Sequence, residues 1–422
     1  MDAVPRRRLA AFFARQGIVQ ALRHRDFAVY AAGTLISITG FWVMRIGIGW
    51  LAWELTHSGV WLGAVALAQA VPAALVTPFA GVIGDRMDRL VLTRLVQLVG
   101  ALIAGLFAVL TYFDLIDPFI LCAMAVLYGA TFAVQLVARS AIGPSLVPKE
   151  DVPAAISVGS AFYGTSAFIG PAIAGILIYR FGVGATFAFN AVAFVGMYAA
   201  MSLVKLRQHE HHGGRQGGFA AEMMAGLRYA ARHAGIAPII VLAVVTAALV
   251  RSLSELIAGF SDLMYGLGPA GLATLMSSFG LGALVGALWI ANRNTVRGTT
   301  TLMLVGAVSS AVLTMVLTLT PHFGAATVLM CLIGFTGACW QNSAQILIQH
   351  AVEGSMRARV MSLFTYNFGS APALGAMIIG GLSAWLSLAQ AISAGAGATL
   401  LVLVWVIARR TAIRDSAEAT PA

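Results

Sequence analysis

Apolar residues run along this chain in long blocks that are separated by short polar or charged segments. A bilayer core about 30 Å thick needs roughly 20 apolar residues in a helix that rises 1.5 Å per residue. Twelve blocks have this length, at 27–53, 60–83, 91–113, 118–139, 152–179, 183–204, 236–260, 268–291, 300–320, 324–349, 358–384 and 387–408. The pattern therefore predicts an all-α polytopic membrane protein with twelve transmembrane helices.

One long polar stretch, 205–235, separates six of these spans from the other six. We expect an N-terminal six-helix bundle with a basic first segment at 1–204, a linker with an amphipathic helix at 205–235, and a C-terminal bundle with a short tail at 236–422. An offset of 205 places glycines of the second half on glycines of the first, among them Gly129 with Gly334, Gly170 with Gly375 and Gly175 with Gly380. The two bundles are therefore predicted to be pseudo-symmetric repeats.

Composition and charge agree with a membrane protein and set its orientation. The chain is 59% hydrophobic and 10% charged, with a mean hydropathy of +0.88, which excludes a soluble domain. Of its 26 Lys and Arg residues, 23 fall in segments on one side of the spans, whereas Arg180 falls on the other and Arg45 and Arg251 lie within spans. Basic residues accumulate in cytoplasmic loops. We expect both termini on the cytoplasmic side of a cell membrane, and no nucleic-acid binding.

No motif for enzymatic chemistry is present. The sequence lacks a Walker A loop, an H-E-x-x-H pair and a nucleophile elbow, so we expect neither an enzyme nor a bound cofactor. Adjacent His209, Glu210, His211 and His212 could form a metal cluster, but in a Gly-rich linker a solvated segment is favoured. The three cysteines lie in predicted spans and predict neither a disulfide nor a zinc site.

A short charged turn follows the second span, between two long apolar runs. Its glycine, Gly81, allows close helix approach, and Asp85 can face a helix N-terminus, where the dipole favours an anion. Arg86 and Arg89 can form pairs across the cytoplasmic face. The alternative is a solvated turn that only sets topology. In the second half, Ile290 replaces Asp85, so the repeat of this turn is degraded.

Six plus six spans and the pattern G-x-x-x-D-R-x-x-R at Gly81, Asp85, Arg86 and Arg89 resemble the major facilitator superfamily. Asp88, where the wider superfamily usually has Gly, and the segment 50–58 are similar to its transmembrane secretion effector branch, which includes enterobactin exporters. The resemblance implies two six-helix bundles, alternating access, a monomer, and a loop that latches the outward-open state.

The fifth span carries a second motif of the superfamily. It resembles a motif of antiporters that export their substrates, and consists of Gly164, Gly170, Pro171 and Gly175. Glycines allow tight packing, and the proline removes a backbone donor and allows a bend. Simple close packing of helices is the alternative explanation.

Charged residues within spans are costly, at least ~2.5–3.5 kcal/mol at the bilayer centre, so a functional role is the default expectation. At 100° per residue, Arg251, Glu255 and Asp262 share one stripe of the seventh span, and Arg251 and Glu255 form an i,i+4 pair. Glu255 is the first candidate for the proton-coupling acid and Asp262, nearer the outer end of the span, is the second. The alternative is a permanent structural ion pair and a solvated span end.

Polar and aromatic residues in helical stripes of the other spans predict a shared central cavity. Spans 3, 6, 9 and 12 lack interior charges, which fits the peripheral position of these four helices in the superfamily. Hydrogen bonds between helices are the alternative role for each polar side chain. The cavity candidates are Arg45, Tyr128, Gln135, Tyr163, Arg251, Asn342, Gln345, Tyr366 and Asn367.

These features together predict a secondary active transporter. We expect a proton-coupled exporter of a small amphiphilic molecule (a drug, a siderophore or a lipid-like compound) that works by alternating access in the bilayer. An importer or facilitator of a small metabolite is the alternative within transport. A membrane sensor or assembly factor with the same fold, but without transport, is the alternative from another class.

Overall fold

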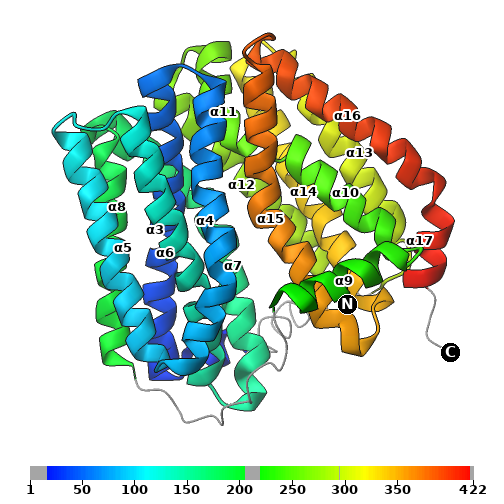
Figure 1. Cartoon of the computed structure of the whole chain (residues 1–422), viewed down its shortest axis with the longest axis horizontal. Helices are drawn as coiled ribbons and strands as arrows, with labels where there is room; N and C mark the ends of the chain where they lie inside the picture. The colour runs from blue at the N-terminus through cyan, green and yellow to red at the C-terminus, as the bar shows by residue number, and fades with distance from the viewer. Residues whose placement is uncertain (1–16, 205–218, 294, 419–422) are drawn as a thin grey trace, which may run out of the picture.

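The computed structural model describes residues 17–204, 219–293 and 295–418. Every regular element in these ranges is a helix, and the elements form two bundles that stand side by side (Figure 1). The predicted fold class, an all-α protein of two six-helix bundles, is confirmed.

The first bundle contains six long helices. A short helix, α2 (Gly17–Leu22), precedes them, and two 3₁₀ turns, η1 (Gly143–Leu146) and η2 (Lys149–Asp151), join α6 to α7. The long helices are α3 (Arg25–Thr56), α4 (Gly59–Arg86), α5 (Arg89–Tyr112), α6 (Pro118–Ile142), α7 (Val152–Phe181) and α8 (Gly184–Leu203).

The second bundle follows α9 (Phe219–Arg232), a helix in the linker between the bundles. Its elements are α10 (Ile236–Leu249), α11 (Leu253–Tyr265), α12 (Gly268–Ala291), α13 (Thr299–Thr318), α14 (Phe323–Ala351), α15 (Gly354–Leu382), α16 (Leu388–Ala408) and the short α17 (Arg410–Ala417).

The seventh predicted span is interrupted. It forms α10 and α11, with a turn at 250–252 between them, where the Arg251 N–H bonds to the Thr246 carbonyl, five residues back, at 3.0 Å. The prediction of one continuous helix with a single charged stripe is therefore wrong, because the angle of 100° per residue does not hold across the turn.

Eleven helical segments among the described residues are long and apolar enough to cross a membrane, and α10 with α11 counts as one of them. The remaining predicted span, the eleventh in chain order, is α15, which has 29 residues but includes Arg357, Arg359 and Asn367 among many small and polar residues. It lies in the second bundle beside the other helices and in contact with α4 of the first.

Two helices of the first bundle begin at acidic N-caps. Asp88 caps α5, since its carboxylate accepts hydrogen bonds from the N–H groups of Leu90 at 2.8 Å and Val91 at 3.0 Å. Asp117 caps α6 in the same way. An acidic N-cap satisfies amide donors that the helix leaves free. The Asp that replaces the usual Gly of the loop motif therefore starts a helix.

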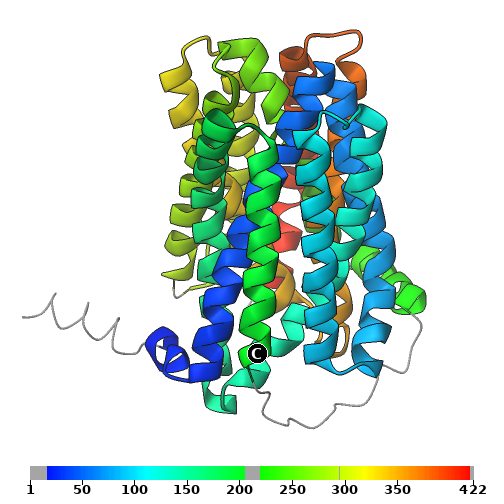
Figure 2. The ribbon, with the colours of Figure 1, turned by 90° about the vertical axis from the view of Figure 1, so that its left-hand side faces the viewer.

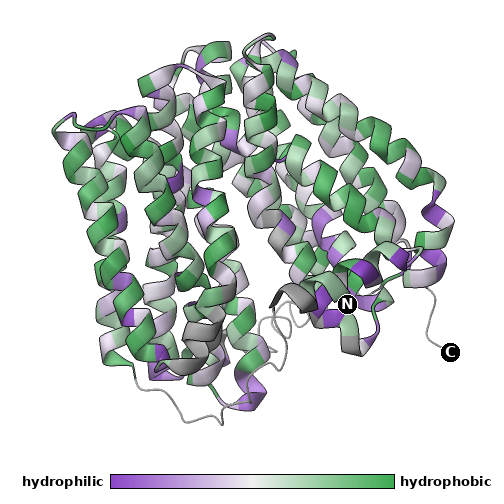
Figure 3. Ribbon diagram, in the orientation of Figure 1, coloured by the Kyte–Doolittle hydropathy of each residue, from purple (hydrophilic) through white to green (hydrophobic). Residues whose placement is uncertain are grey.

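The outer surface of both bundles is apolar. Figure 3 shows hydrophobic residues along the outer helices and hydrophilic residues gathered at the lower end of the second bundle. Large apolar side chains on the outer helices are exposed, for example Leu102 on α5, Val192 on α8, Val305 on α13 and Leu401 on α16. These four helices correspond to the predicted peripheral spans, and their surfaces fit a lipid environment.

The bundles meet through α4 with α15 and through α7 with α12. The contacts near the α3–α4 turn are very close: a Cβ added at Gly63 would lie 2.6 Å from the carbonyl oxygen of Ala376. Toward the opposite end, where α9 lies, the bundles diverge (Figure 1). We call these the converging end and the diverging end.

Candidate functional site

The turn at 250–252 places Glu255 in the first turn of α11, opposite α3 of the other bundle. Glu255 Oε1 accepts a hydrogen bond from Arg45 Nη2, so an ion pair joins the two bundles. The Arg45 side chain is 31% exposed and that of Glu255 is 14% exposed. The pair is therefore sheltered but remains within reach of solvent.

Arg251 lies in the turn itself, and its guanidinium donates to Gln341 Oε1 on α14 at 3.1 Å. It is also within electrostatic range of Arg45 and Glu255. Of Arg251 and Glu255, predicted as an i,i+4 pair on one helix, Arg251 lies in the interruption between α10 and α11 and Glu255 lies in α11. Two cations and one carboxylate converge instead, so the cluster has a net positive charge.

A second polar contact between α3 and α11 involves Asp262. Its Oδ2 accepts a hydrogen bond from the indole Nε1 of Trp53 at 2.9 Å. Trp53 is 2% exposed, so its ring is packed inside the converging end. Asp262 lies near the end of the span, as the sequence predicts, and its partner is a neutral donor.

An aromatic wall continues from Arg45 on the first bundle. The guanidinium carbon lies 5.9 Å from the centroid of Trp42, and the Trp42 ring meets Tyr163 edge to face at 5.7 Å. Tyr163 is 50% exposed, whereas the Trp42 indole nitrogen is buried and has no hydrogen-bond partner among the described residues. This wall offers apolar surface together with an unused hydrogen-bond donor.

A pocket of about 390 Å³ lies beside this wall, between α3, α6 and α7. Tyr30, Arg139 and Tyr163 are among the residues that line it. The Tyr30 hydroxyl donates to the backbone carbonyl of Arg139 at 3.2 Å, so this hydrogen bond does not involve the guanidinium group. Within the described part of the chain, Arg139 forms no ion pair. It adds a third positive charge on the inner side of the bundles.

Two predicted cavity residues are instead buried within the first bundle. Tyr128 is 3% exposed, and Gln135 donates to Ser37 at 3.2 Å and to Gln97 at 3.4 Å. Both hydrogen bonds join helices of the same bundle. Gln135 therefore has the alternative role, a hydrogen bond between helices. Gln97 is not among the predicted residues, although a buried amide in the otherwise apolar third span is a visible signal.

In the second bundle, Asn342 and Gln345 on α14 are partly exposed, and Asn367 on α15 has a buried amide nitrogen without a hydrogen-bond partner among the described residues. The side chain of Tyr366 lies outside the described residues. Gln341, which holds Arg251, is not among the predicted cavity residues. It lies next to Asn342 and belongs to the same polar stretch of sequence.

The glycine motif of α7 lies at helix contacts. A Cβ added at Gly164 would lie 3.0 Å from Leu284 of α12, and one at Gly175 would overlap Ala273 of the same helix. At Gly170 it would lie 2.5 Å from Trp42 of α3. Pro171 lies inside α7, as predicted. The motif therefore lets α7 pack closely against α3 of its own bundle and against α12 of the other bundle.

The sequence model of the transmembrane secretion effector family of the major facilitator superfamily matches residues 17–422. The chain belongs to this family. The similar proteins that follow are transporters by name.

Relatives by sequence are matched over part of their length. The staphyloferrin A transporter of Staphylococcus aureus is 31% identical over 166 residues, which are 39% of this chain and 42% of the relative. An uncharacterised transporter of the superfamily from Bacillus subtilis, YfiS, is 27% identical over 164 residues, or 39% of this chain and 38% of the relative. The matched part is therefore less than half of either protein.

Solved structures share the fold. The nucleoside transporter NupG superposes with a TM-score of 0.72 at 13% identity, over 91% of this chain and 99% of NupG. A bacterial homologue of the lysosomal transporter Spinster, in an inward-facing conformation, has a TM-score of 0.72 at 14% identity, over 94% of this chain and 99% of the homologue. At such identities the likeness shows the fold alone.

The loop motif is described only in part. Arg89 donates to Ser145 of η1 at 3.4 Å, which ties the start of α5 to the end of α6. The backbone of Gly81, Asp85 and Arg86 belongs to α4, but their side chains lie outside the described residues, and so does the cluster His209–His212. The latch therefore stays a prediction. No group of metal ligands occurs among the residues that the structure describes.

Proposed function

We propose that this transporter is a proton-coupled exporter of a small amphiphilic molecule with an acidic group. The observation that carries the proposal is the ion pair of Arg45 with Glu255, which joins the two bundles beside an aromatic wall. The family name, transmembrane secretion effector, and the α7 glycine motif support export. The relative named staphyloferrin A transporter supports a small-molecule substrate.

The orientation of the protein follows from its basic residues. With both termini in the cytoplasm of a cell membrane, the diverging end faces the cytoplasm and the converging end faces outward. The described arrangement is then an inward-open state, and Glu255 and Asp262 belong to its outer closure. A monomer is sufficient for this cycle, because both bundles and all the named contacts come from one chain.

Coupling needs a proton and a substrate that act on the same contact. The Arg45–Glu255 pair holds α3 to α11 only while Glu255 is ionised and Arg45 has no other anion to bind. Protonation of Glu255 removes the pair, and so does a substrate acid that takes the place of Glu255 on Arg45. Either event favours separation of the converging end, and the aromatic wall holds the apolar part of the substrate.

The substrate is proposed to be acidic because positive charge dominates the inner side of the bundles. Arg45, Arg139 and Arg251 lie there, and Glu255 is the acid that faces this cluster. Asp262 is already bonded to Trp53. An amphiphile with one carboxylate would therefore find more favourable partners than a cationic one would.

Proteoliposomes with an imposed pH gradient test this proposal. A panel of amphiphilic acids is screened for counterflow, and transport of the best compound is then measured with and without the gradient. Glu255→Gln should retain counterflow but lose the response to the gradient, because an amide at this position cannot take up or release a proton. Glu54→Gln, which removes an exposed acid elsewhere on α3, should respond as the wild type does.

Three outcomes would contradict the proposal. Unchanged gradient response in Glu255→Gln would remove Glu255 from coupling. Transport only in the opposite direction in oriented vesicles would indicate an importer or facilitator. Absence of counterflow for the whole panel, in folded protein, would favour a sensor or assembly factor with the same fold.

A further inference from the structure

The linker helix α9 lies across the spans and not along them. It packs on α15 and α10 at the diverging end of the second bundle (Figures 1 and 2). A Cβ added at Gly226 would lie 3.1 Å from the carbonyl oxygen of Arg359, and Ala230 is 2% exposed. One face of α9 is thus fixed against the bundle, and the opposite face has no partner among the described residues.

The free face of α9 combines apolar and basic side chains. Met224 is 54% exposed and Leu227 is 47% exposed, and Ala231 lies on the same face one turn further. The exposed Arg228 and Arg232 follow one edge of this apolar stripe. A helix with an apolar face bordered by arginines is typical of a helix that lies in the plane of a membrane interface.

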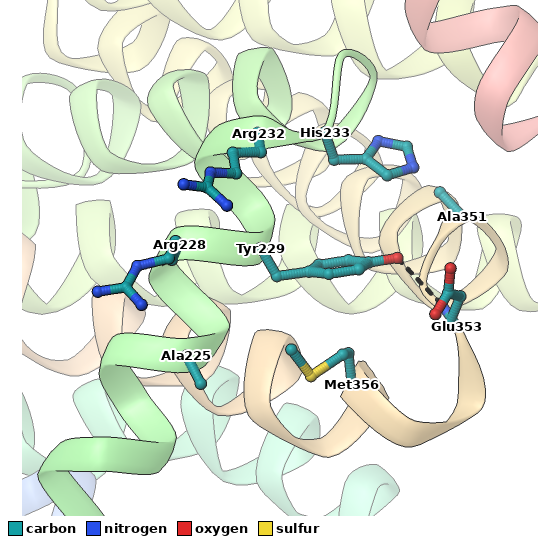
Figure 4. Close-up of a pocket in the computed structure, with 8 residues that line it drawn as sticks. All are labelled: Ala225, Arg228, Tyr229, Arg232, His233, Ala351, Glu353 and Met356. Carbon is teal, nitrogen blue, oxygen red and sulfur yellow. Dashed lines mark hydrogen bonds between the residues drawn. The ribbon is translucent and has the colours of Figure 1, made fainter.

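The arginine edge of α9 opens into a pocket of about 470 Å³ between α9 and the start of α15 (Figure 4). His233 Nδ1 accepts the backbone N–H groups of Gly235 and Ile236, both at 3.2 Å, so the ring hydrogen is on Nε2 and can be donated. The pocket is lined by Ala225, Arg228, Tyr229, Arg232, His233, Ala351, Glu353 and Met356.

Hydrogen-bond donors dominate this pocket. The Tyr229 hydroxyl accepts the Glu353 N–H at 3.4 Å, which leaves the hydroxyl hydrogen available, and the His233 ring is a further donor. Arg228 and Arg232 line the outer edge of the pocket, and their guanidinium groups point away from Tyr229 and Glu353 (Figure 4). Glu353 is the single acid among the lining residues, and its carboxylate lies on the α15 side. Donors and positive charge favour an oxyanion such as a phosphate.

We propose that this pocket binds the phosphate headgroup of an anionic phospholipid, whose acyl chains contact Met224 and Leu227. The pocket alone would accept a free phosphate as well, but only a lipid has acyl chains that can contact the apolar stripe beside the pocket. The cytoplasmic leaflet is the source of the lipid, which rests on the membrane orientation proposed above and not on proton coupling. Bound lipid fixes the linker helix, and with it the start of α15, at the membrane surface.

Native mass spectrometry of the purified full-length chain in detergent tests the proposal, with phosphatidylglycerol and phosphatidylcholine as probes. The wild type should retain phosphatidylglycerol in preference to phosphatidylcholine. Arg228→Gln with Arg232→Gln should weaken phosphatidylglycerol binding by about tenfold or more, since each basic residue near a membrane surface contributes ~1 kcal/mol. Met224→Ser with Leu227→Ser should weaken it as well, because the acyl contact is lost.

Matched controls separate this site from surface charge in general. Arg297→Gln with Arg410→Gln removes two exposed arginines at the same end and should leave lipid binding unchanged. Equal losses in both double variants would overturn the proposal in favour of unspecific charge attraction. Full competition by inorganic phosphate, together with no effect of the two Ser substitutions, would also overturn it and indicate a free-anion site. Correct folding of each variant is checked by its elution as a monodisperse peak.

Discussion

The two bundles meet through contacts of two chemical kinds. In the α4–α15 and α7–α12 crossings, glycines such as Gly63 and Gly175 let one backbone approach the other, and the atoms nearest to an added Cβ belong to uncharged residues. In the α3–α11 contact, the Arg45–Glu255 ion pair and the Trp53–Asp262 hydrogen bond join helices of opposite bundles. A glycine crossing depends on side-chain volume alone, whereas the polar contact also depends on protonation and on competing ligands.

This difference assigns separate roles to the two kinds of contact. The glycine crossings allow the bundles to come close at any pH, so they determine how completely the converging end closes. The polar contact is stabilising only while Glu255 is ionised, so it determines when the converging end can open. Changes to the polar contact should therefore alter coupling, and changes to the crossings should alter closure.

The largest effect is expected from reversal of the charge on Arg45. Arg45→Glu places two carboxylates against each other in a sheltered site, and leaving a buried charge without its partner costs ~3–5 kcal/mol. We expect substrate transport to fall to background in proteoliposomes. The double variant Arg45→Glu with Glu255→Arg restores an ion pair and should recover part of the activity. Equal loss in the single and double variants would show that the pair as such is not required.

A smaller effect is expected from filling a glycine crossing. Gly63→Leu would push against the backbone of Ala376 and Met377, and overpacking of this kind costs ~1–3 kcal/mol. We expect slower transport, with an unchanged number of protons per substrate, measured from the reversal potential in proteoliposomes. Gly105→Leu, where an added Cβ has no neighbour within 4 Å, is the matched control. A changed stoichiometry would mean that the crossing also takes part in coupling.

Most of the fold could be predicted from the sequence, because the length of each apolar block is fixed by the bilayer. The break at 250–252 could not be predicted, since neither Gly nor Pro marks it. It depends on tertiary contacts: Ser252 is fully buried in the turn, and Arg251 reaches Gln341 on α14. Helical periodicity describes one helix at a time and carries no signal for such contacts.

Sequence alone selects charged residues within spans but not the partners that they contact. Intramembrane charge identified Arg45 and Glu255 because burial of a charge needs a compensating contact. The partner of Glu255 lies 210 positions away, on another helix, and only the arrangement of the bundles brings the two together. Gln135 was predicted in the cavity from its polarity, but a buried amide is equally suited to a hydrogen bond within its own bundle.

Removal of the Trp53–Asp262 hydrogen bond should separate its contribution to closure from that of the Arg45–Glu255 ion pair. Trp53→Phe keeps an aromatic ring, although a smaller one, and deletes the donor to Asp262, a hydrogen bond worth ~1 kcal/mol. We expect the outward-open population to rise about fivefold. Spin labels at positions 149 and 357, both exposed at the diverging end, report the change through electron–electron distances in a variant without native cysteines.

Because Trp53→Phe leaves the ion pair in place, its proton coupling should match that of the wild type. Loss of the gradient response in this variant would show that Asp262, and not Glu255 alone, takes part in coupling. An unchanged distance distribution, in contrast, would show that the indole bond contributes nothing to closure.

The smallest effect is expected from an acid far from the polar contact. Glu418, at the end of α17, accepts backbone N–H groups of Gly298 at 3.0 Å and Thr300 at 2.6 Å, and so caps α13. Burial raises the pKa of Glu418, but the hydrogen bonds from Thr300 and Gly298 and the charge of Arg414 outweigh it, so the pKa lies below its usual range. The stabilisation is therefore present above the ordinary carboxyl pKa and is lost as the pH falls through the lowered value.

Glu418→Gln should remove this pH-dependent part of the stability, about 0.5–1 kcal/mol. Thermal unfolding of the wild type should then lose more stability between neutral and acidic pH than unfolding of the variant does. Proton coupling should be the same in both, because Glu418 lies at the diverging end and contacts neither α3 nor α11. If Glu418→Gln altered the gradient response as Glu255→Gln is expected to, the pH dependence would not be specific to the polar contact, and the division of roles between the two kinds of contact would fail.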